Sequence, residues 1–167
     1  EATTGRPLMI RRYKDRAARI NLSGGHRQDC LQARLRRMGL LGNKHIPERY
    51  FAAGTAQRWA LLQGLMDTDG TVNRCGGHTT ARCSFSSTDE RLAADVWRLC
   101  RSLGLKASRL VGDAKIGNRV IGAAYRVEFA ASADEPVFRM PRKQALLPAT
   151  IGKRSRNYYL AAAEIIQ

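Results

Sequence analysis

Apolar residues recur every three or four positions in three stretches of the chain, a spacing that predicts amphipathic helices. The expected helices cover residues 26–38, 56–67 and 88–103. Thr55 is the expected N-cap of the second helix, and a capping box at Ser87 and Glu90 is expected to begin the third. Gly39 and Gly104 follow the first and third helices, and we expect them to end these helices because glycine adopts the left-handed conformation of a C-terminal cap.

Short segments of alternating apolar and polar residues, bounded by glycine, predict β-strands between these helices. The expected strands cover residues 16–22, 71–75, 79–86, 105–111 and 120–130. Gly76-Gly77 forms the expected turn of the first hairpin, and residues 112–119 form the loop of the second. Residues 1–14 are polar and basic, and we expect a loose arm there. Residues 55–148 follow the order helix, hairpin, helix, hairpin, short helix, which predicts an α+β fold with an antiparallel sheet.

One face of the second helix carries small side chains. Ala60, Gly64 and Thr68 are spaced by four residues, so they lie one above the other on a helix. A stripe of small residues lets a second helix backbone approach closely, and Leu61 and Leu65 add apolar surface beside it. We therefore expect this face to pack against another helix.

Two acidic residues, Asp67 and Asp69, fall at the C-terminal end of the same helix. The helix dipole already places negative potential there, so two carboxylates are costly unless a cation lies beside them. Unpaired carbonyl groups of the last turn would face the same cation. Oxygen ligands of this kind favour Mg²⁺ or Ca²⁺ over zinc. The alternative is that Asp-x-Asp-Gly forms only a solvated turn.

The charge of the chain indicates a polyanionic partner. Lys and Arg number 29 against 14 Asp and Glu, which gives a net charge of +15 and an isoelectric point near 10.7. Charge of one sign destabilises a compact chain by self-repulsion unless a partner neutralises it. The alternative is a generally basic protein from an arginine-rich proteome.

The patterns of membrane proteins and zinc proteins are missing from the sequence. No segment approaches 18 consecutive apolar residues, the length that would predict a membrane span. The four cysteines, at positions 30, 75, 83 and 100, form no C-x-x-C pair. The nearest approach to a metal cluster is Cys75, His78 and Cys83. We expect reduced thiols in an intracellular protein.

Residues 62–70, Leu-Gln-Gly-Leu-Met-Asp-Thr-Asp-Gly, resemble the signature helix of the LAGLIDADG homing endonucleases. Gln63 and Thr68 replace the two alanines of that signature. Two flanking blocks also match the family, Lys-His-Ile-Pro at 44–47 and Phe-Ser-Ser-Thr at 85–88. The resemblance covers about residues 26–148 and is closest to endonuclease domains of bacterial inteins, including those of replicative helicases.

The resemblance implies a site-specific, metal-dependent endonuclease that cuts both strands of duplex DNA. In this family two signature helices pack about a two-fold or pseudo-two-fold axis, and two four-stranded sheets form a saddle over the major groove. Asp69 would hold Mg²⁺ or another divalent cation, with the Thr68 carbonyl as a further ligand. Lys44 matches the assisting lysine of the first repeat, and Lys143 is the candidate for the second.

Basic residues of the second repeat are candidates for contact with DNA bases or phosphates. They are Arg74, Arg82, Lys106, Lys115, Arg119 and Arg126. The set that faces DNA depends on the register of the two hairpins, because a shift by one residue moves every side chain to the other face.

By the resemblance, residues 1–47 are a remnant of the first repeat, residues 48–150 a complete second repeat, and residues 151–167 a tail leading toward a splicing domain. A first signature motif is absent, and the chain neither begins with Cys or Ser nor ends in His-Asn. We therefore expect the inner and C-terminal part of a larger intein in the bacterial cytoplasm. The first repeat of the same polypeptide, or a second copy, would supply the partner helix.

Two alternatives to the endonuclease stay open. The first is a DNA-binding or scaffold domain of the same fold that has lost cleavage. A basic RNA-binding splicing cofactor of this fold is the third possibility, and competition between duplex DNA and structured RNA separates it from the others.

Overall fold

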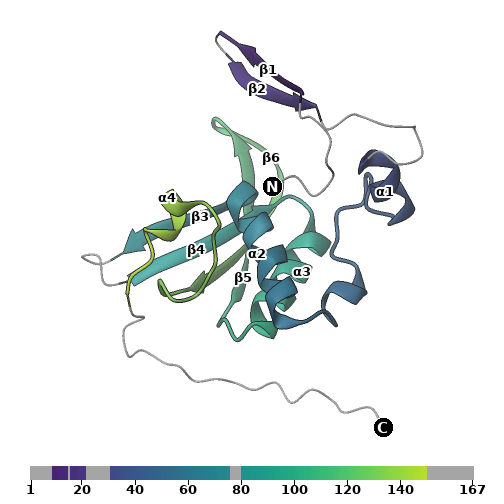
Figure 1. Cartoon of the computed structure of the whole chain (residues 1–167). Coiled ribbons are helices and arrows are strands. Elements are labelled where there is room, and N and C mark those ends of the chain that lie inside the picture. Colours follow the sequence, from purple (N-terminus) through teal and green to yellow (C-terminus); the bar gives the residue numbers. More distant parts are fainter. Residues whose placement is uncertain (1–8, 15, 22–30, 76–79, 150–167) are drawn as a thin grey trace. The chain divides into compact units, whose positions relative to one another are not determined.

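The computed structural model describes residues 9–14, 16–21, 31–75 and 80–149 (Figure 1). The chain divides into two units, Glu1–Lys44 and His45–Gln167, and each is described by itself. The expected Gly76-Gly77 turn and the C-terminal tail lie outside the described residues.

The first unit contains a β-hairpin and a helix. Strand β1 (Met9–Tyr13) pairs antiparallel with β2 (Arg16–Asn21). The strand expected at 16–22 is therefore confirmed, whereas the loose arm expected over residues 1–14 is wrong for β1. The sequence of β1 is basic and gives no strand signal. The strand forms because its backbone N–H and C=O groups pair with those of β2. The described part of the first helix is α1 (Leu31–Arg37), and Gly39 follows it with the expected positive φ of 68°.

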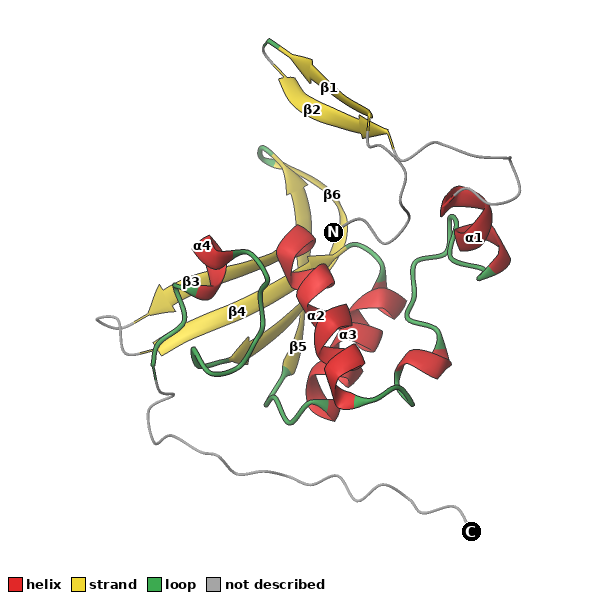
Figure 2. Cartoon of the chain, viewed as in Figure 1, coloured by secondary structure: helices red, strands yellow, loops and turns green. Residues whose placement is uncertain are grey.

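The second unit is built on a four-stranded antiparallel sheet with the strand order β3-β4-β6-β5 (Figure 2). Its strands are β3 (Gly70–Cys75), β4 (Thr80–Ser87), β5 (Ser108–Ile116) and β6 (Arg119–Ala130). Its helices are η1 (Glu48–Tyr50, a 3₁₀ turn), α2 (Thr55–Asp69), α3 (Glu90–Ser102) and α4 (Pro141–Gln144). This order confirms the α+β fold with an antiparallel sheet.

The core lies between the sheet and helices α2 and α3, which cover one of its faces. Alternate residues of the central strands are buried on this side: Ala81, Cys83 and Phe85 of β4, and Val127 and Phe129 of β6. The helices contribute Leu62 and Met66 from α2, and Val96, Leu99 and Cys100 from α3. No helix within the described ranges is long and apolar enough to cross a membrane.

The opposite side of the sheet is called the open face here. Its members follow from the register, because cross-strand partners share a side and alternate with the buried residues. They are Thr71, Asn73, Arg82, Ser84, Ser86, Ser108, Leu110, Arg126, Glu128 and Ala130. Most of these side chains are exposed, so the open face is a largely polar surface backed by the core.

Two of the four cysteines belong to the core. Cys83 and Cys100 are free and buried. Burial raises the pKa of Cys83 to about 12 and also raises the pKa of Cys100. Because the thiolate is the reactive form, both thiols are inert near neutral pH. The expectation of reduced cysteines therefore holds for these two.

Both N-caps differ from the sequence prediction. Helix α2 is capped by Gly54, whose N–H donates to Oε1 of Gln57 at 3.2 Å, and Thr55 is the first helical residue. Helix α3 is capped by Asp89, which accepts a hydrogen bond from the Leu92 N–H at 3.0 Å. Ser87 instead accepts from the Asp89 N–H. Three successive residues, Ser87 to Asp89, can each cap a helix, so the sequence alone did not decide which one does.

The second hairpin is longer than predicted. Its strands reach Ile116 and Arg119 and leave only Gly117 and Asn118 as the turn, where residues 112–119 were expected to form a loop. Gly117 has a φ of 58°, which the tight turns of hairpins require. The outer part of this hairpin is exposed on both sides, so it lacks the alternation that identifies a half-buried strand.

Two glycines of α2 and its C-cap give a matched test of this packing. A Cβ at Gly70 would lie 2.6 Å from the Met66 carbonyl oxygen, whereas a Cβ at Gly64 meets nothing within 4 Å. We expect Gly70→Ala to lower the free energy of unfolding by about 2 kcal/mol through overpacking. Gly64→Ala should raise it by about 0.5–1 kcal/mol through helix propensity. Urea unfolding measures both, and equal shifts would contradict this geometry.

Candidate nucleic-acid interface and metal site

The C-terminal turn of α2 presents Thr68 and Asp69 to solvent. The Thr68 hydroxyl donates back to its own helix, to the carbonyl oxygens of Gly64 and Leu65 at 3.1 Å each. In the described part of the chain no group forms a hydrogen bond or an ion pair with the Asp69 carboxylate. Asp69 is therefore an exposed carboxylate available to a ligand.

Asp67 has a different environment, although it lies only two residues earlier. Its carboxylate accepts hydrogen bonds from the backbone N–H groups of Arg139 at 3.3 Å and Met140 at 3.2 Å. The Arg139 side chain adds a bond from Nε to Oε1 of Gln63 at 3.1 Å. Asp67 thus fastens the segment before α4 to the end of α2, which is the role of a structural acid.

Lys143 of α4 is bound to the same helix end. Its Nζ donates to the carbonyl oxygens of Met66 at 2.9 Å, Asp67 at 2.9 Å and Gly70 at 2.7 Å. The ammonium has three N–H donors, so this arrangement uses all of them. Lys143 supplies the positive charge that the negative end of the helix dipole favours. The structure therefore places this predicted catalytic lysine on backbone carbonyls, and its catalytic role stays a prediction.

This contact changes the argument for a metal ion. The two acids at the end of α2 predict a cation beside them, and Lys143 is such a cation. The groups of the predicted metal site that Lys143 does not bind are the Asp69 carboxylate and the Thr68 carbonyl. Among the described residues no group of three His, Cys, Asp or Glu side chains could hold a metal. These two oxygens suit a hard cation but supply only part of its ligands.

Ile46, the third residue of the Lys-His-Ile-Pro block, is bound to α3 within the second unit. Ile46 is buried, and its N–H donates to Oδ2 of Asp95 at 2.8 Å. Two residues later, Glu48 pairs with Arg98, whose guanidinium lies 4.0 Å from the centre of the Phe51 ring. The hydrogen bond from Arg98 lowers the pKa of Glu48. Lys44 is exposed and belongs to the first unit, so its place beside Asp69 stays a prediction.

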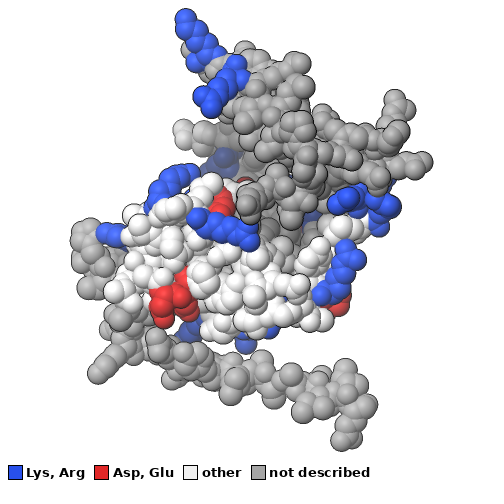
Figure 3. Space-filling view, viewed as in Figure 1, with Lys and Arg blue, Asp and Glu red and all other residues white. Residues whose placement is uncertain are grey.

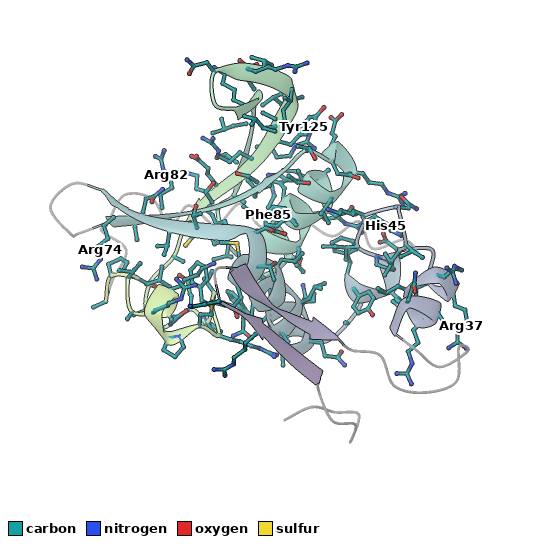
Figure 4. All side chains as sticks on the ribbon, turned by 90° about the horizontal axis from the view of Figure 1, so that it is seen from above. Arg37, His45, Arg74, Arg82, Phe85 and Tyr125 are labelled. Carbon is teal, nitrogen blue, oxygen red and sulfur yellow. The ribbon has the colours of Figure 1, made fainter. Side chains whose placement is uncertain are left out.

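The register separates the predicted DNA-binding residues. Arg82 and Arg126 lie on the open face and are 65% and 55% exposed. Arg74 is opposite the buried Ala81 and therefore points to the other side, where its guanidinium donates to the carbonyl oxygens of Leu146 and Ala145. Figure 4 shows the side chains of Arg74 and Arg82 leaving the sheet in different directions.

The other three candidates lie around the β5–β6 hairpin. Lys106 is exposed in the segment before β5. Lys115 and Arg119 are exposed near the tip, where Lys115 pairs with Asp113 at 3.7 Å. Their contact with DNA stays a prediction, since no structural feature distinguishes them from ordinary exposed basic residues.

Sequence reasoning missed Glu128, which lies between the two arginines of the open face. Its Oε2 is 3.2 Å from Nη1 of Arg82, and its Oε1 is 3.7 Å from Nη1 of Arg126. Within the strand expected at residues 120–130, Glu128 is one of several polar residues that alternate with apolar ones. The signal was available in principle, because Arg126 and Glu128 are two residues apart and so share a face of any strand.

The small-residue stripe of α2 is accessible within the described structure. Ala60 is half-buried, and Gly64 and Thr68 are exposed. Leu61 and Leu65 are only partly buried against the core. The stripe therefore retains the shape that was predicted to receive another helix.

Replacing Lys143 tests its role at the end of α2. We expect Lys143→Met to lower the free energy of unfolding by about 2 kcal/mol, because it removes hydrogen bonds from a charged donor. The neighbouring Arg142 is exposed, so Arg142→Met should change the free energy by less than about 0.5 kcal/mol. Chemical denaturation measures both variants, and an unchanged midpoint for Lys143→Met would show that the three bonds contribute nothing.

Comparison with known proteins agrees with the fold of the second unit. Residues 56–132, which run from α2 to just beyond β6, match the LAGLIDADG-like domain. One similar protein is the replicative DNA helicase DnaB of Mycobacterium intracellulare, which is 42% identical over 113 residues. The match covers 68% of this chain and 18% of the helicase, so the chain spans less than a fifth of that relative's length. The match to the LAGLIDADG-like domain thus takes in α3, the four strands of the sheet and all of α2 except its first residue.

Proposed function

We propose that residues 48–150 form the second repeat of a site-specific, metal-dependent homing endonuclease that cuts double-stranded DNA and is carried by an intein. The observation that carries the proposal is the exposed Asp69, whose carboxylate has no partner among the described residues, at the end of a signature helix fixed by Asp67 and Lys143. The family match supports the endonuclease class. Similarity to a replicative helicase supports an intein within such a protein.

The open face is the proposed DNA-contacting surface. Its side chains are mainly small and polar, and its two arginines point outward. Guanidinium groups bind phosphates and the edges of guanine through paired hydrogen bonds. The net charge of +15 supplies attraction for a polyanion, and Figure 3 shows more basic than acidic side chains on the visible surface of the described residues.

The proposed chemistry is hydrolysis of a phosphodiester bond. Asp69 and the Thr68 carbonyl would hold Mg²⁺ or another divalent cation, which activates water and neutralises charge on phosphate and leaving group. Lys143 would position this site indirectly, because it donates hydrogen bonds to the carbonyl groups of the turn that carries Asp69. Lys44 is the proposed assisting lysine of the first repeat, since lysine stabilises developing negative charge.

The proposed partner of α2 is a second signature helix packed on Ala60, Gly64 and Thr68. It would come from a first repeat in the same polypeptide, of which residues 1–47 are the proposed remnant, or from a second copy of this chain. Such a helix would bring a second acid to the metal site, which the incomplete ligand set of Asp69 and Thr68 calls for. Residues 151–167 would lead toward the splicing domain.

A second candidate function is a DNA-binding or scaffold domain of the same fold that does not cut. Two observations favour it: the described residues hold no three-residue metal cluster, and Lys143 is committed to backbone carbonyls. The endonuclease and a DNA-binding domain would both bind DNA, so cleavage distinguishes them, whereas a scaffold domain need not bind DNA. A structured RNA competitor, added to the same binding reaction, tests the RNA-binding alternative.

Salt dependence tests the DNA-binding part of the proposal. The chain should bind mixed-sequence duplex DNA, with affinity falling as salt rises by a log–log slope of about −0.9 for each phosphate neutralised. Fluorescence anisotropy at several salt concentrations measures the slope. Binding that ignores salt, or that structured RNA displaces more readily than duplex DNA, would contradict DNA binding by this basic surface.

The two acids of α2 test the cleavage part. In the chain extended by its upstream repeat, Asp69→Asn should leave the melting temperature unchanged and abolish Mg²⁺-dependent cutting. Asp67→Asn should lower the melting temperature, because it weakens acceptance from two backbone N–H groups, and should retain cutting at low temperature. A plasmid-cleavage assay with thermal melts of both variants measures this. Full activity of Asp69→Asn would overturn the assignment.

A further inference from the structure

Glu128 occupies the centre of the open face. It lies on β6 opposite Ser84 of β4 and Ser108 of β5, so its neighbours across the sheet are small. Its side chain is 14% exposed, while those of Arg82 and Arg126 are 65% and 55% exposed. The Glu128 carboxylate is thus largely buried between two exposed arginine side chains.

One carboxylate serves both arginines. Oε2 accepts a hydrogen bond from Arg82 at 3.2 Å, and Oε1 lies 3.7 Å from the Arg126 guanidinium. Arg82 reaches Glu128 from the neighbouring strand, whereas Arg126 lies two residues away on the same strand. The arrangement ties two flexible side chains to a common carboxylate and leaves more than half of each arginine side chain exposed.

The same acid opposes binding of phosphate. Of the residues assigned to the open face, Glu128 alone is acidic. Its charge reduces the attraction of the two arginines for a phosphate, which is the sequence-independent part of DNA affinity. An arginine held at a fixed place still reads a guanine edge, because that contact depends on paired hydrogen bonds with the correct geometry.

We propose that Glu128 is a specificity-determining residue: it positions Arg82 and Arg126 for base contact and weakens binding to arbitrary duplexes. The inference rests on the proposed DNA binding by the open face. An acidic residue would thus contribute to DNA recognition in a protein whose net charge is strongly positive.

The test compares Glu128→Gln with the parent chain on two probes. The first is a mixed-sequence duplex, and the second is the set of duplexes that the parent enriches from a random-sequence pool. Glu128→Gln should bind the mixed duplex about 3- to 10-fold more tightly at low salt, because one opposing charge is removed. Its log–log salt slope should steepen by about 0.9 to 1.8, as one or two freed arginines contact phosphates.

The selectivity of Glu128→Gln should move in the opposite direction. The ratio of its affinities for enriched and mixed duplexes should fall by about 10-fold, as expected when a positioned base contact is lost. Glu128→Asp keeps the charge but shortens the side chain. It should therefore retain the parent's weak binding to mixed duplex while losing part of the selectivity, which separates the charge from the positioning.

Glu48→Gln is the matched control, because it removes the same charge from another Arg–Glu pair, formed with Arg98 of α3 rather than on the open face. It should match the parent in slope and selectivity. A Glu128→Gln variant that matches Glu48→Gln, or that binds mixed duplex more weakly than the parent, would overturn the inference. A parent chain that binds no duplex would instead overturn the proposed function, and the inference with it.

Discussion

The hydrogen bonds from Lys143 to three carbonyl groups at the end of α2 are the constraint on which the candidate site depends. A helix that ends in two acids accumulates negative potential at its C-terminus. Lys143 opposes this potential from within the protein, and Asp67 turns toward the backbone of the adjoining segment. Gly70, which leaves no space for a side chain against Met66, completes the turn. These contacts fix the helix end that carries Asp69, whose own carboxylate is exposed and has no partner among the described residues.

In this arrangement the two acids have different roles, and so do the two faces of the sheet. One acid secures the chain and the other is left for a ligand, although they differ by only two positions. The buried side of the sheet rests on α2 and α3, and the open face carries the paired arginines. The proposed function requires an acid that can hold a metal ion and a surface that can hold DNA, and we assign these roles to Asp69 and to the open face of the second unit.

Local pattern was sufficient to predict α2, α3 and the order of the hairpins, because their apolar spacing and glycine boundaries are local features. The partner of the helix end was not predictable in this way. Lys143 is 73 residues from Gly70 in sequence, and no local periodicity connects them. Two acids at a helix C-terminus indicate a cation, and from the sequence we expect a metal ion, whereas in the structure Lys143 is the cation bound there.

The face of the sheet on which each strand residue lies could not be predicted for a related reason. The sequence does not determine the register of the hairpin around Gly76-Gly77, so it leaves both Arg74 and Arg82 as candidates for DNA contact, whereas the structure places them on opposite sides of the sheet. The outer β5–β6 hairpin was expected to be a loop because neither of its sides is buried. Pairing between strands determines all of these features, and it is a property of tertiary structure.

Arginine side-chain NMR tests most directly whether the open face binds duplex DNA. Arg82 and Arg126 project from this face, whereas the guanidinium groups of Arg58, Arg74 and Arg98 are bound to Ser102, Leu146 and Glu48 respectively. On addition of duplex DNA, the Nε–H signals of Arg82 and Arg126 should shift or broaden, and those of the other three should remain unchanged. Shifts confined to Arg58, Arg74 and Arg98 would contradict the account, because DNA would then bind on the helix side of the sheet.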